Sequence, residues 1–468
     1  MAFGLLLAVQ LLVIWLVNIH VLSSPVQDVP NIPEIDQIHS DVCIIGGGSA
    51  GTYAAIRLRQ MGKTVVVIEK ESLLGGHTNT YIDAGTGIPV DYGVIVFHND
   101  AIVKNYFAHF KVPLAPLSLS DRGGTNQIAV DFRTGNLVNI SIPGNATAAL
   151  ERYVGELAKY PYLTKGFDLP DPVPEDLLLP FGEFVRKYDL GAAVPAITAI
   201  TQGIGDPLRQ PTIYLMKYFN LGAVESYRTN FLTTAHHNNS ALYDAARNEL
   251  GKDVFLNSNI SKMCRNSNDS MNRVRICTPG GLKTIRASKI LIAIPQKLEN
   301  LEGFDLDATE RALFAQFHNT QYYTTLVKHT GIPEGLQISN QAADMPYGLP
   351  SLPGAYVITP TAVSGLVNIF YGSASEMSSE QVKEDIIATV LRLHNANIST
   401  TPPDFVAFKD HSPFELTVPA KAIANGFYRR LNSIQGHRKT WHTGAAFQAH
   451  DSTDIWKFTE DVVRAMFK

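Results

Sequence analysis

A glycine-rich turn between two short apolar runs near the start of the chain constrains its fold more than any other feature. Residues 41–45 are mostly apolar and lead into the spacing Gly46-x-Gly48-x-x-Gly51. A helical stretch follows, and a second apolar run at 65–68 ends at Glu69. A buried parallel strand reads as a continuous apolar run, so the pattern predicts a strand–helix–strand unit. The glycine spacing and the acid after the second strand indicate a dinucleotide site.

Each residue of this motif has a mechanical role in binding a dinucleotide. Gly46 makes the tight turn, Gly48 lets the backbone approach a pyrophosphate, and Gly51 lets the helix pack closely on the strand. Amides at the helix start, where Ser49 lies, bind the diphosphate. The Glu69 carboxylate is placed to accept hydrogen bonds from ribose hydroxyls. A glycine-rich turn that binds nothing is the alternative. It is the weaker one, because the strand, the helix and the acid all stand at the positions that a dinucleotide motif requires.

The residues that follow Glu69 separate the two common dinucleotides. They include Gly75-Gly76-His77 and then Asp91-Tyr-Gly93. Here the chain resembles the flavin-containing amine oxidase superfamily, whose pattern is an acid, a spacer, Gly-Gly-Arg and a later Asp-x-Gly. The resemblance implies FAD, held close to backbone at both glycines. His77 replaces the usual Arg. The guanidinium of Arg is always charged and can donate two parallel hydrogen bonds to a diphosphate, whereas a neutral imidazole cannot.

Two later segments extend the resemblance. Three β-like runs lie between residues 253 and 295, and the resemblance places Ile260 beside the adenine. Near the end, a strand leads to Gly444 and a helical stretch over 453–467 that would face the flavin ring. The expected fold is α/β and amine-oxidase-like, with a discontinuous Rossmann-like FAD-binding domain at 40–100, 251–300 and 437–468. Residues 101–250 and 301–436 would form an α+β substrate domain.

Within this superfamily the chain is most similar to the β-cyclopiazonate dehydrogenase group of fungal FAD-dependent oxidoreductases. That resemblance implies an enzyme of secondary metabolism that dehydrogenates a small apolar substrate, in some cases with ring closure. Three alternatives stay open: a flavin-dependent double-bond isomerase of the polyenoic fatty acid isomerase type, an amine oxidase, and a non-enzymatic FAD-binding protein.

Candidate residues around the flavin ring are few, because the flavin performs the redox step itself and no base is recognisable from a motif. Tyr322, Tyr323 and Tyr371, with Phe370, lie in β-like runs and are candidates for a substrate wall. Ordinary strand packing is the alternative for each of them. His77 and His442 are the histidines closest to the flavin motifs, and either could contact FAD or carry it covalently. A plain hydrogen-bonding or packing role is the favoured alternative for each.

The start of the chain and its composition suggest a compartment. Residues 3–17 are apolar with one polar break and small residues follow, which predicts a signal peptide over 1–23, with an uncleaved membrane anchor as the alternative. Secretion, or a lumenal location, is therefore expected, and a small molecule is the expected partner. The formal net charge of −4 does not indicate the basic surface that nucleic-acid binding requires. The sequence also contains glycosylation sequons at Asn139, Asn145, Asn238, Asn259, Asn268 and Asn397.

The chain has only three cysteines and is therefore not a disulfide scaffold. Cys264 and Cys277 flank a turn-like stretch, and a hairpin centred between them would place them opposite one another, so a cross-strand disulfide is one expectation and two free thiols the other. No CxxC or HExxH pattern suggests a metal site, and none is expected.

Overall fold

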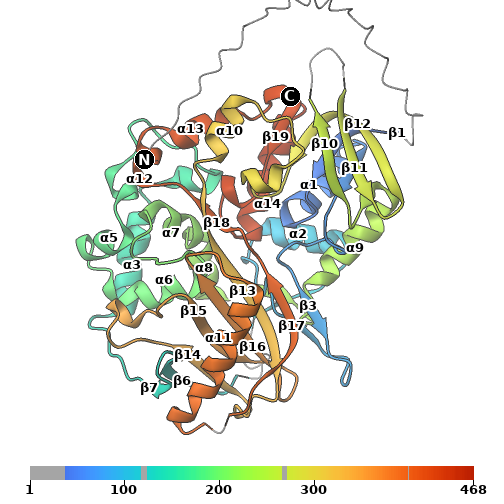
Figure 1. Cartoon of the computed structure of the whole chain (residues 1–468). Coiled ribbons are helices and arrows are strands. Elements are labelled where there is room, and N and C mark those ends of the chain that lie inside the picture. Colours follow the sequence, from blue (N-terminus) through green and yellow to red (C-terminus); the bar gives the residue numbers. More distant parts are fainter. Residues whose placement is uncertain (1–36, 118–123, 266–270, 399) are drawn as a thin grey trace, which may run out of the picture.

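The computed structural model describes residues 37–117, 124–265, 271–398 and 400–468. Two large sheets organise this part of the chain (Figure 1), and each draws its strands from segments that are distant in sequence. Two short ribbons complete the β-structure: β3 (Thr80–Ile82) with β4 (Pro89–Asp91), and β5 (Leu114–Pro116) with β8 (Leu232–Thr234).

The first sheet has seven strands and contains the predicted strand–helix–strand unit. Its order is β10-β11-β12-β1-β2-β9, with β19 paired to β12. The strands are β1 (Gln37–Ile45), β2 (Val65–Ile68), β9 (Val254–Phe255), β10 (Asn259–Cys264), β11 (Asn272–Thr278), β12 (Gly281–Ile292) and β19 (Thr440–His442). The central strands β12, β1, β2 and β9 run parallel.

Side chains of β1 and β2 alternate between two apolar cores, which explains their uninterrupted apolar sequence. Val42 and Ile44 face the layer formed by helices α1 (Ser49–Gln60), α2 (Ala101–His109), α9 (Ser240–Leu250) and α14 (Ser452–Ala465). Cys43 and Ile45 face the opposite core. Helices α2 and α9, which lie in the range 101–250 predicted for the substrate side, pack with α1 and α14 on the first sheet.

The second sheet has eight strands in the order β17-β13-β16-β15-β14-β6-β7, with β18 paired to β13. These are β6 (Asn126–Asp131), β7 (Asn136–Leu137), β13 (His318–Lys328), β14 (Leu336–Asn340), β15 (Gly354–Pro360), β16 (Val367–Ser373), β17 (Asp404–Asp410) and β18 (Phe414–Thr417). Helix α11 (Ser379–Arg392) covers one face, and its Val382, Ile386 and Val390 enter a common core with the strands.

A helical group lies beside both sheets and shares a core with β1 and β2 (Figure 1). Its members are α3 (Ala146–Leu157), α4 (Glu175–Leu178), α5 (Phe181–Lys187), α6 (Val194–Ile200), α7 (Thr212–Tyr218), α8 (Leu221–Thr229), α10 (Ala308–Phe314), α12 (Ala420–Ala424) and α13 (Phe427–Ser433). The fold thus brings two sheets and a helical layer around one central region.

Of the two expectations for Cys264 and Cys277, the cross-strand disulfide is contradicted by the structure. In the β10–β11 hairpin Cys264 lies opposite Arg273, and Cys277 lies opposite Asn259, so the two thiols are several positions apart along the strands. Both cysteines are free. The hairpin is not centred midway between the cysteines, and that shift of register removes the pairing.

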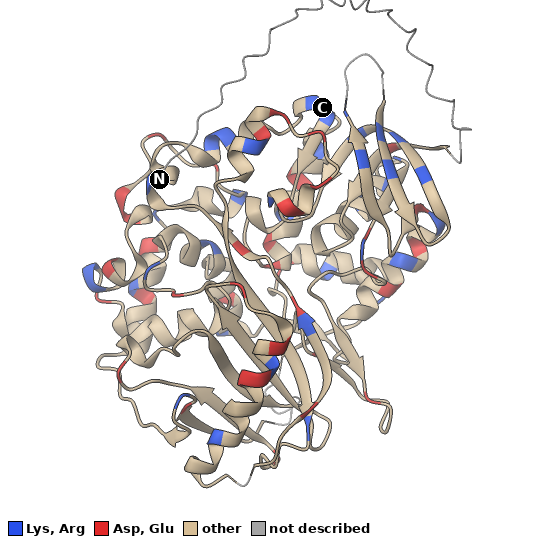
Figure 2. Cartoon of the chain, viewed as in Figure 1, with Lys and Arg blue, Asp and Glu red and all other residues tan. Residues whose placement is uncertain are grey.

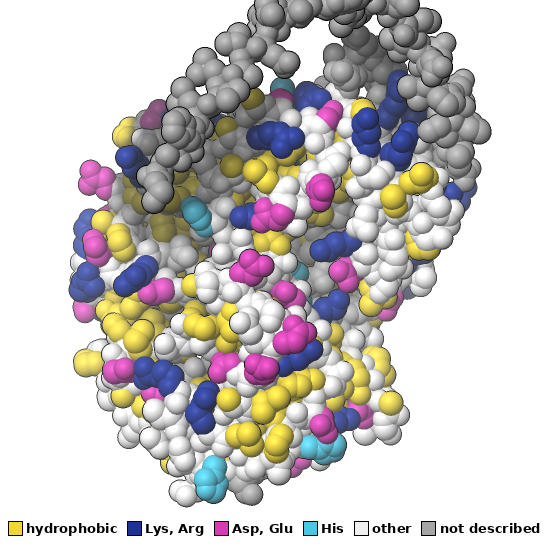
Figure 3. All heavy atoms as spheres, viewed as in Figure 1, with side chains coloured by type: hydrophobic (Ala, Val, Ile, Leu, Met, Phe, Trp, Pro, Cys, Tyr) yellow, Lys and Arg dark blue, Asp and Glu magenta, His cyan; other side chains and the backbone are white. Residues whose placement is uncertain are grey.

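The surface shows neither a dominant charge nor a large apolar face in the view drawn. Acidic and basic side chains are interspersed over most elements, with Lys and Arg recurring along β10–β12 (Figure 2). Hydrophobic side chains form small groups among them (Figure 3). No helix within the described residues is long and apolar enough to cross a membrane.

The predicted leader over 1–23 and the sequon at Asn268 lie outside the described residues. Among the other sequons Asn238 is half-buried, and four asparagines are exposed: Asn139, Asn145, Asn259 and Asn397.

Candidate cofactor and substrate site

The turn between β1 and α1 has the geometry that a dinucleotide requires. Gly46 has a φ of +101°, in the region that favours glycine. A side chain at Gly51 would meet the Gly46 carbonyl oxygen at 1.9 Å, so the close packing of helix on turn requires glycine there. At Gly48 an added Cβ meets only the Gly76 Cα, at 3.8 Å. The backbone at Gly48 therefore borders a groove that larger side chains would fill.

The second glycine motif forms the facing wall of this groove. The Gly75 amide donates to the Gly47 carbonyl oxygen at 2.9 Å, and Gly76, with φ +58°, lies against Gly48. A side chain at Gly93 would meet the His77 carbonyl oxygen at 2.0 Å. The Gly-Gly and Asp-x-Gly segments therefore pack backbone to backbone on the first turn.

Asp91 fixes this arrangement to helix α9. One oxygen of its buried carboxylate accepts from the Asn239 amide at 2.9 Å and from the Thr80 hydroxyl. Asp91 thus connects the β3–β4 ribbon to the helical layer that covers the first sheet.

Glu69 lies at the end of β2 with its carboxylate directed at the glycine turn. One oxygen accepts from the Gly47 amide at 2.6 Å and the other from the Glu71 amide at 2.8 Å. Burial raises the pKa of Glu69, and these two amides oppose that rise. The Ser258 amide donates to the Glu69 carbonyl oxygen, and Ile260 follows in β10, which brings the predicted adenine segment beside the acid.

Ser49 ties the start of α1 to the last helix of the chain. Its hydroxyl lies 3.0 Å from the Ser452 hydroxyl and accepts from the Trp456 indole at 2.9 Å and the Tyr243 hydroxyl at 3.2 Å. The N-termini of α1 and α14 therefore meet, and their exposed amides favour negative or electron-rich groups. Gly444, with φ +107°, precedes this helix in open space.

A cavity of about 1010 Å³ extends from the α14 N-terminus to the second sheet. Its walls come from segments 93–98, 195–209 and 337–359, with further residues from β13, β16, β18 and the start of α14. The volume exceeds what one flavin ring occupies, so the cavity can hold a ring and a substrate together.

Three histidines and an aromatic side chain form one wall of the cavity, called here the histidine wall: His77, His411, Phe414 and His450. The His77 ring centre lies 4.6 Å from that of His411 and 5.4 Å from that of His450. Burial lowers the pKa of His77 to about 4 and holds the pKa values of His411 and His450 well below the usual range. All three imidazoles are therefore neutral near pH 7.

The predicted substrate tyrosines divide between the two faces of the second sheet. Tyr322 lines the cavity, as does Phe370. Tyr323 and Tyr371 do not: they pair with each other across β13 and β16 and enter the core under α11. The Tyr323 hydroxyl donates to the Met377 carbonyl oxygen, and the Tyr371 hydroxyl to Asp385. Their assignment to the wall is wrong because successive side chains of a strand alternate between faces.

His442, the second candidate for flavin contact, lies away from the cavity. Its ring is fully buried beside Phe314 and Phe447, and neither ring nitrogen has a hydrogen-bond partner among the described residues. His442 therefore packs in the core below β19, and His77 is the member of the predicted pair that reaches the cavity.

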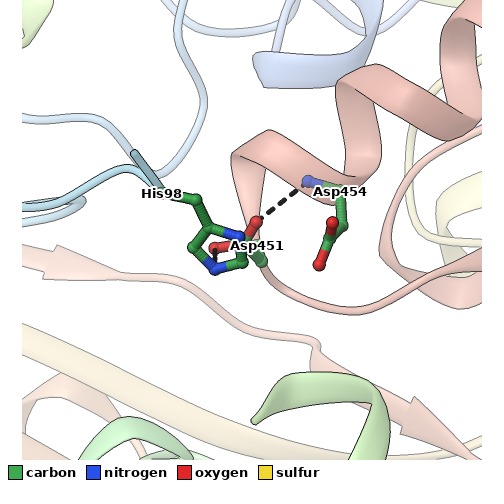
Figure 4. A group of neighbouring side chains, drawn as sticks. All are labelled: His98, Asp451 and Asp454. Carbon is green, nitrogen blue, oxygen red and sulfur yellow. Dashed lines mark hydrogen bonds and ion pairs between the residues drawn. The ribbon is translucent and has the colours of Figure 1, made fainter. Parts of the chain in front are cut away.

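His98 and Asp451 form an ionisable pair at the α14 N-terminus that has no counterpart among the predicted site residues. The His98 Nε2 lies 3.3 Å from an Asp451 carboxylate oxygen, while the other oxygen caps α14 through the Asp454 amide (Figure 4). Burial raises the pKa of Asp451. Asp454 lies within reach of both, but Asn220 and the Lys457 ammonium already occupy its two oxygens. A nearby ammonium disfavours a metal cation here.

The residues present fit FAD. Two glycine turns leave a backbone-lined groove at Gly48, an acid and helix amides stand at its ends, and the groove leads toward a cavity large enough for a ring. Gly46, Gly48, Ser49 and Gly76 would hold the diphosphate side, and Glu69 the ribose. FAD supplies a two-electron acceptor when bound, and the protein supplies orientation and exclusion of water.

Comparisons with known proteins agree with this geometry. Residues 44–110 match the family model described as NAD(P)-binding Rossmann-like domain. The FAD-dependent oxidoreductase oblC of Cochliobolus heterostrophus is 39% identical over 92% of this chain and 91% of its own. The β-cyclopiazonate dehydrogenase of Aspergillus oryzae is 34% identical over 92% of this chain and 94% of its own.

Solved structures with low sequence identity share the fold. A fatty acid isomerase from P. acnes has a TM-score of 0.74 at 18% identity and covers 92% of this chain and 99% of its own. Putrescine oxidase has a TM-score of 0.63 at 15% identity, with the same coverage of both chains. The amine-oxidase-like fold predicted from the sequence is confirmed.

Proposed function

Because the chain belongs to the family of FAD-dependent oxidoreductases that includes β-cyclopiazonate dehydrogenase, we propose that it dehydrogenates a small uncharged natural product in secondary metabolism. In this proposal two hydrogens leave a C–N or C–C bond of the substrate, one as a hydride equivalent and one as a proton. The substrate in this proposal occupies the cavity lined by the histidine wall.

The main support for this proposal is that the cavity interior offers no unpaired charged side chain among the described residues. Among the described lining residues other than histidine, only Asp206, Arg209 and Asp451 bear a formal charge, and the three imidazoles of the histidine wall are neutral. Asp206 and Arg209 are exposed and pair with each other, while Asp451 is engaged by His98. A cationic amine would need a free carboxylate, and a fatty acid would need a buried cation. The interior instead offers apolar, aromatic and neutral polar side chains.

Anaerobic titration of the FAD-loaded enzyme tests this function. We expect uncharged polycyclic substrates to bleach the flavin absorption, and putrescine or linoleic acid to leave it unchanged. Turnover should also reduce oxygen or an artificial acceptor in proportion to product. Substrate conversion without acceptor reduction would indicate an isomerase instead, and bleaching by putrescine alone would indicate an amine oxidase.

We also propose that the enzyme acts in the secretory pathway, either lumenal or secreted, with the segment 1–23 as its signal. The apolar start of the chain and the exposed sequon asparagines support this location. Expression in a fungal host should yield protein whose mass falls on treatment with an endoglycosidase and whose N-terminus begins near residue 24. An intact Met1 on unglycosylated protein would contradict the location.

A further inference from the structure

We propose that His450 is a fixed hydrogen-bond donor that selects substrates bearing a carbonyl oxygen, an inference that rests on the uncharged substrate class proposed above. His450 lines the cavity one residue before Asp451, the cap of α14. Its role follows from the tautomer that its backbone partner imposes.

The tautomer is set by the main chain of β18. The Glu415 backbone N–H donates to the His450 Nε2, at 3.1 Å. A backbone amide can only donate, so Nε2 must carry a lone pair, and the single proton of the neutral ring lies on Nδ1. Protonation of Nε2 would set two N–H groups against each other. His450 is therefore held as an Nδ1–H donor and cannot act as a base through Nε2.

Packing fixes the orientation of this donor. The His450 ring stacks on Phe414, with ring centres 4.0 Å apart, and lies nearly parallel to the His77 ring, whose centre is 5.4 Å away. Among the described residues nothing accepts from the Nδ1–H, and the half-buried side chain leaves that nitrogen accessible within the cavity. A substrate with a hydrogen-bond acceptor can therefore bind to this N–H group.

The surroundings of His450 define that acceptor. No cation stands on the histidine wall to hold an anionic oxygen, and the His411 Nε2 is already engaged by the Thr324 hydroxyl. A neutral carbonyl oxygen suits a neutral imidazole N–H. A ligand that covers the donor without bonding it would leave a buried polar group unpaired, so a carbonyl should improve affinity roughly tenfold.

Three substitutions separate the two ring nitrogens. His450→Asn retains a donor near the Nδ1 position, His450→Gln retains an acceptor for the Glu415 amide near the Nε2 position, and His450→Phe retains the stacking alone. If the proposal holds, only the Asn variant keeps the preference for a carbonyl.

The probes are 1-tetralone and tetralin, which differ by one carbonyl oxygen, and binding to the FAD-loaded full-length protein is measured by calorimetry. We expect the wild type to bind tetralone roughly tenfold more tightly. The Phe and Gln variants should bind both probes about equally. Nitrogen-15 NMR of histidine-labelled holoenzyme should show His450, assigned by its loss in the variants, protonated at Nδ1.

The outcomes distinguish this inference from the proposed function. Equal binding of both probes by the wild type, a preference that persists in the Phe variant, or an Nε2-protonated His450 would each overturn the inference alone. Binding of neither probe would overturn the uncharged substrate class and the inference with it.

Discussion

His442 shows how a single buried side chain can make the fold sensitive to acid. Its ring lacks hydrogen-bond partners among the described residues, and burial lowers its pKa to about 3. Below pH 6.5 the unfolded chain takes up a proton that the folded protein cannot accept until about pH 3. The associated stability is therefore complete above pH 6.5 and is lost as the pH falls toward 3.

Replacement His442→Leu should remove this acid sensitivity. We expect a variant at least as stable at pH 7.5, because an unpaired polar ring is replaced by an apolar side chain. Between pH 7.5 and 5 the wild type should lose about 2 kcal/mol more free energy of unfolding than the variant. Urea titrations at both pH values measure this, with His394→Leu at an exposed position as control. An equal loss of unfolding free energy in the wild type and the His442→Leu variant would contradict the assignment of the acid sensitivity to His442.

The groove at Gly48 predicts a loss of FAD without a loss of fold. Gly48→Val adds a Cβ that has only the Gly76 Cα within 4 Å, and two methyl groups beyond it, so the side chain should occupy the diphosphate position. We expect purified protein with less than about a tenth of the wild-type flavin absorbance, a loss of at least about 1.4 kcal/mol in binding. Gly155→Ala, within α3 and with open space around its Cβ, should keep FAD and add about 0.5–1 kcal/mol of stability.

At the scale of elements, the N-terminus of α14 couples local stability to the cofactor site. Asp451→Ala removes the side chain that caps the Asp454 amide and should cost about 1 kcal/mol of unfolding free energy. FAD should also dissociate faster, because the same helix end contacts Ser49. Asp451→Asn should keep the cap.

Ser378→Ala is the matched control for this cap, since Ser378 caps α11 on the far sheet. It should destabilise the protein by a similar amount in urea titration and leave the FAD dissociation rate unchanged. Equal FAD dissociation in all three variants would contradict the coupling between α14 and the site.

Elements whose chemistry is local were predictable from the sequence, and contacts between distant elements were not. The βαβ unit and its glycine turn follow from spacing within about thirty residues, and the Gly75-Gly76 motif follows from the resemblance to the amine oxidase superfamily. The histidine wall joins the second glycine motif to β17–β18 and the α14 start, and no spacing rule connects His77 with His411 or His450. The division of Tyr322 from Tyr323, by contrast, was available from strand alternation alone.

For the whole molecule, the discontinuous cofactor segments predict that FAD stabilises one half of the structure selectively. The groove is formed by the turn after β1, the Gly-Gly segment, the stretch between β9 and β10, and the start of α14. FAD at a thousandfold excess over its dissociation constant should add about 4 kcal/mol to the free energy of unfolding. Local protection should concentrate in the elements that contact it.

Hydrogen exchange of the FAD-loaded and FAD-depleted protein checks this distribution. On removal of FAD, amides in 43–52, 67–77, 254–260 and 450–456 should exchange faster. Amides in β6, β14 and α11, which share a separate core, should change little. A uniform increase over both sheets would show instead that they unfold as one unit and that the cofactor stabilises the chain globally.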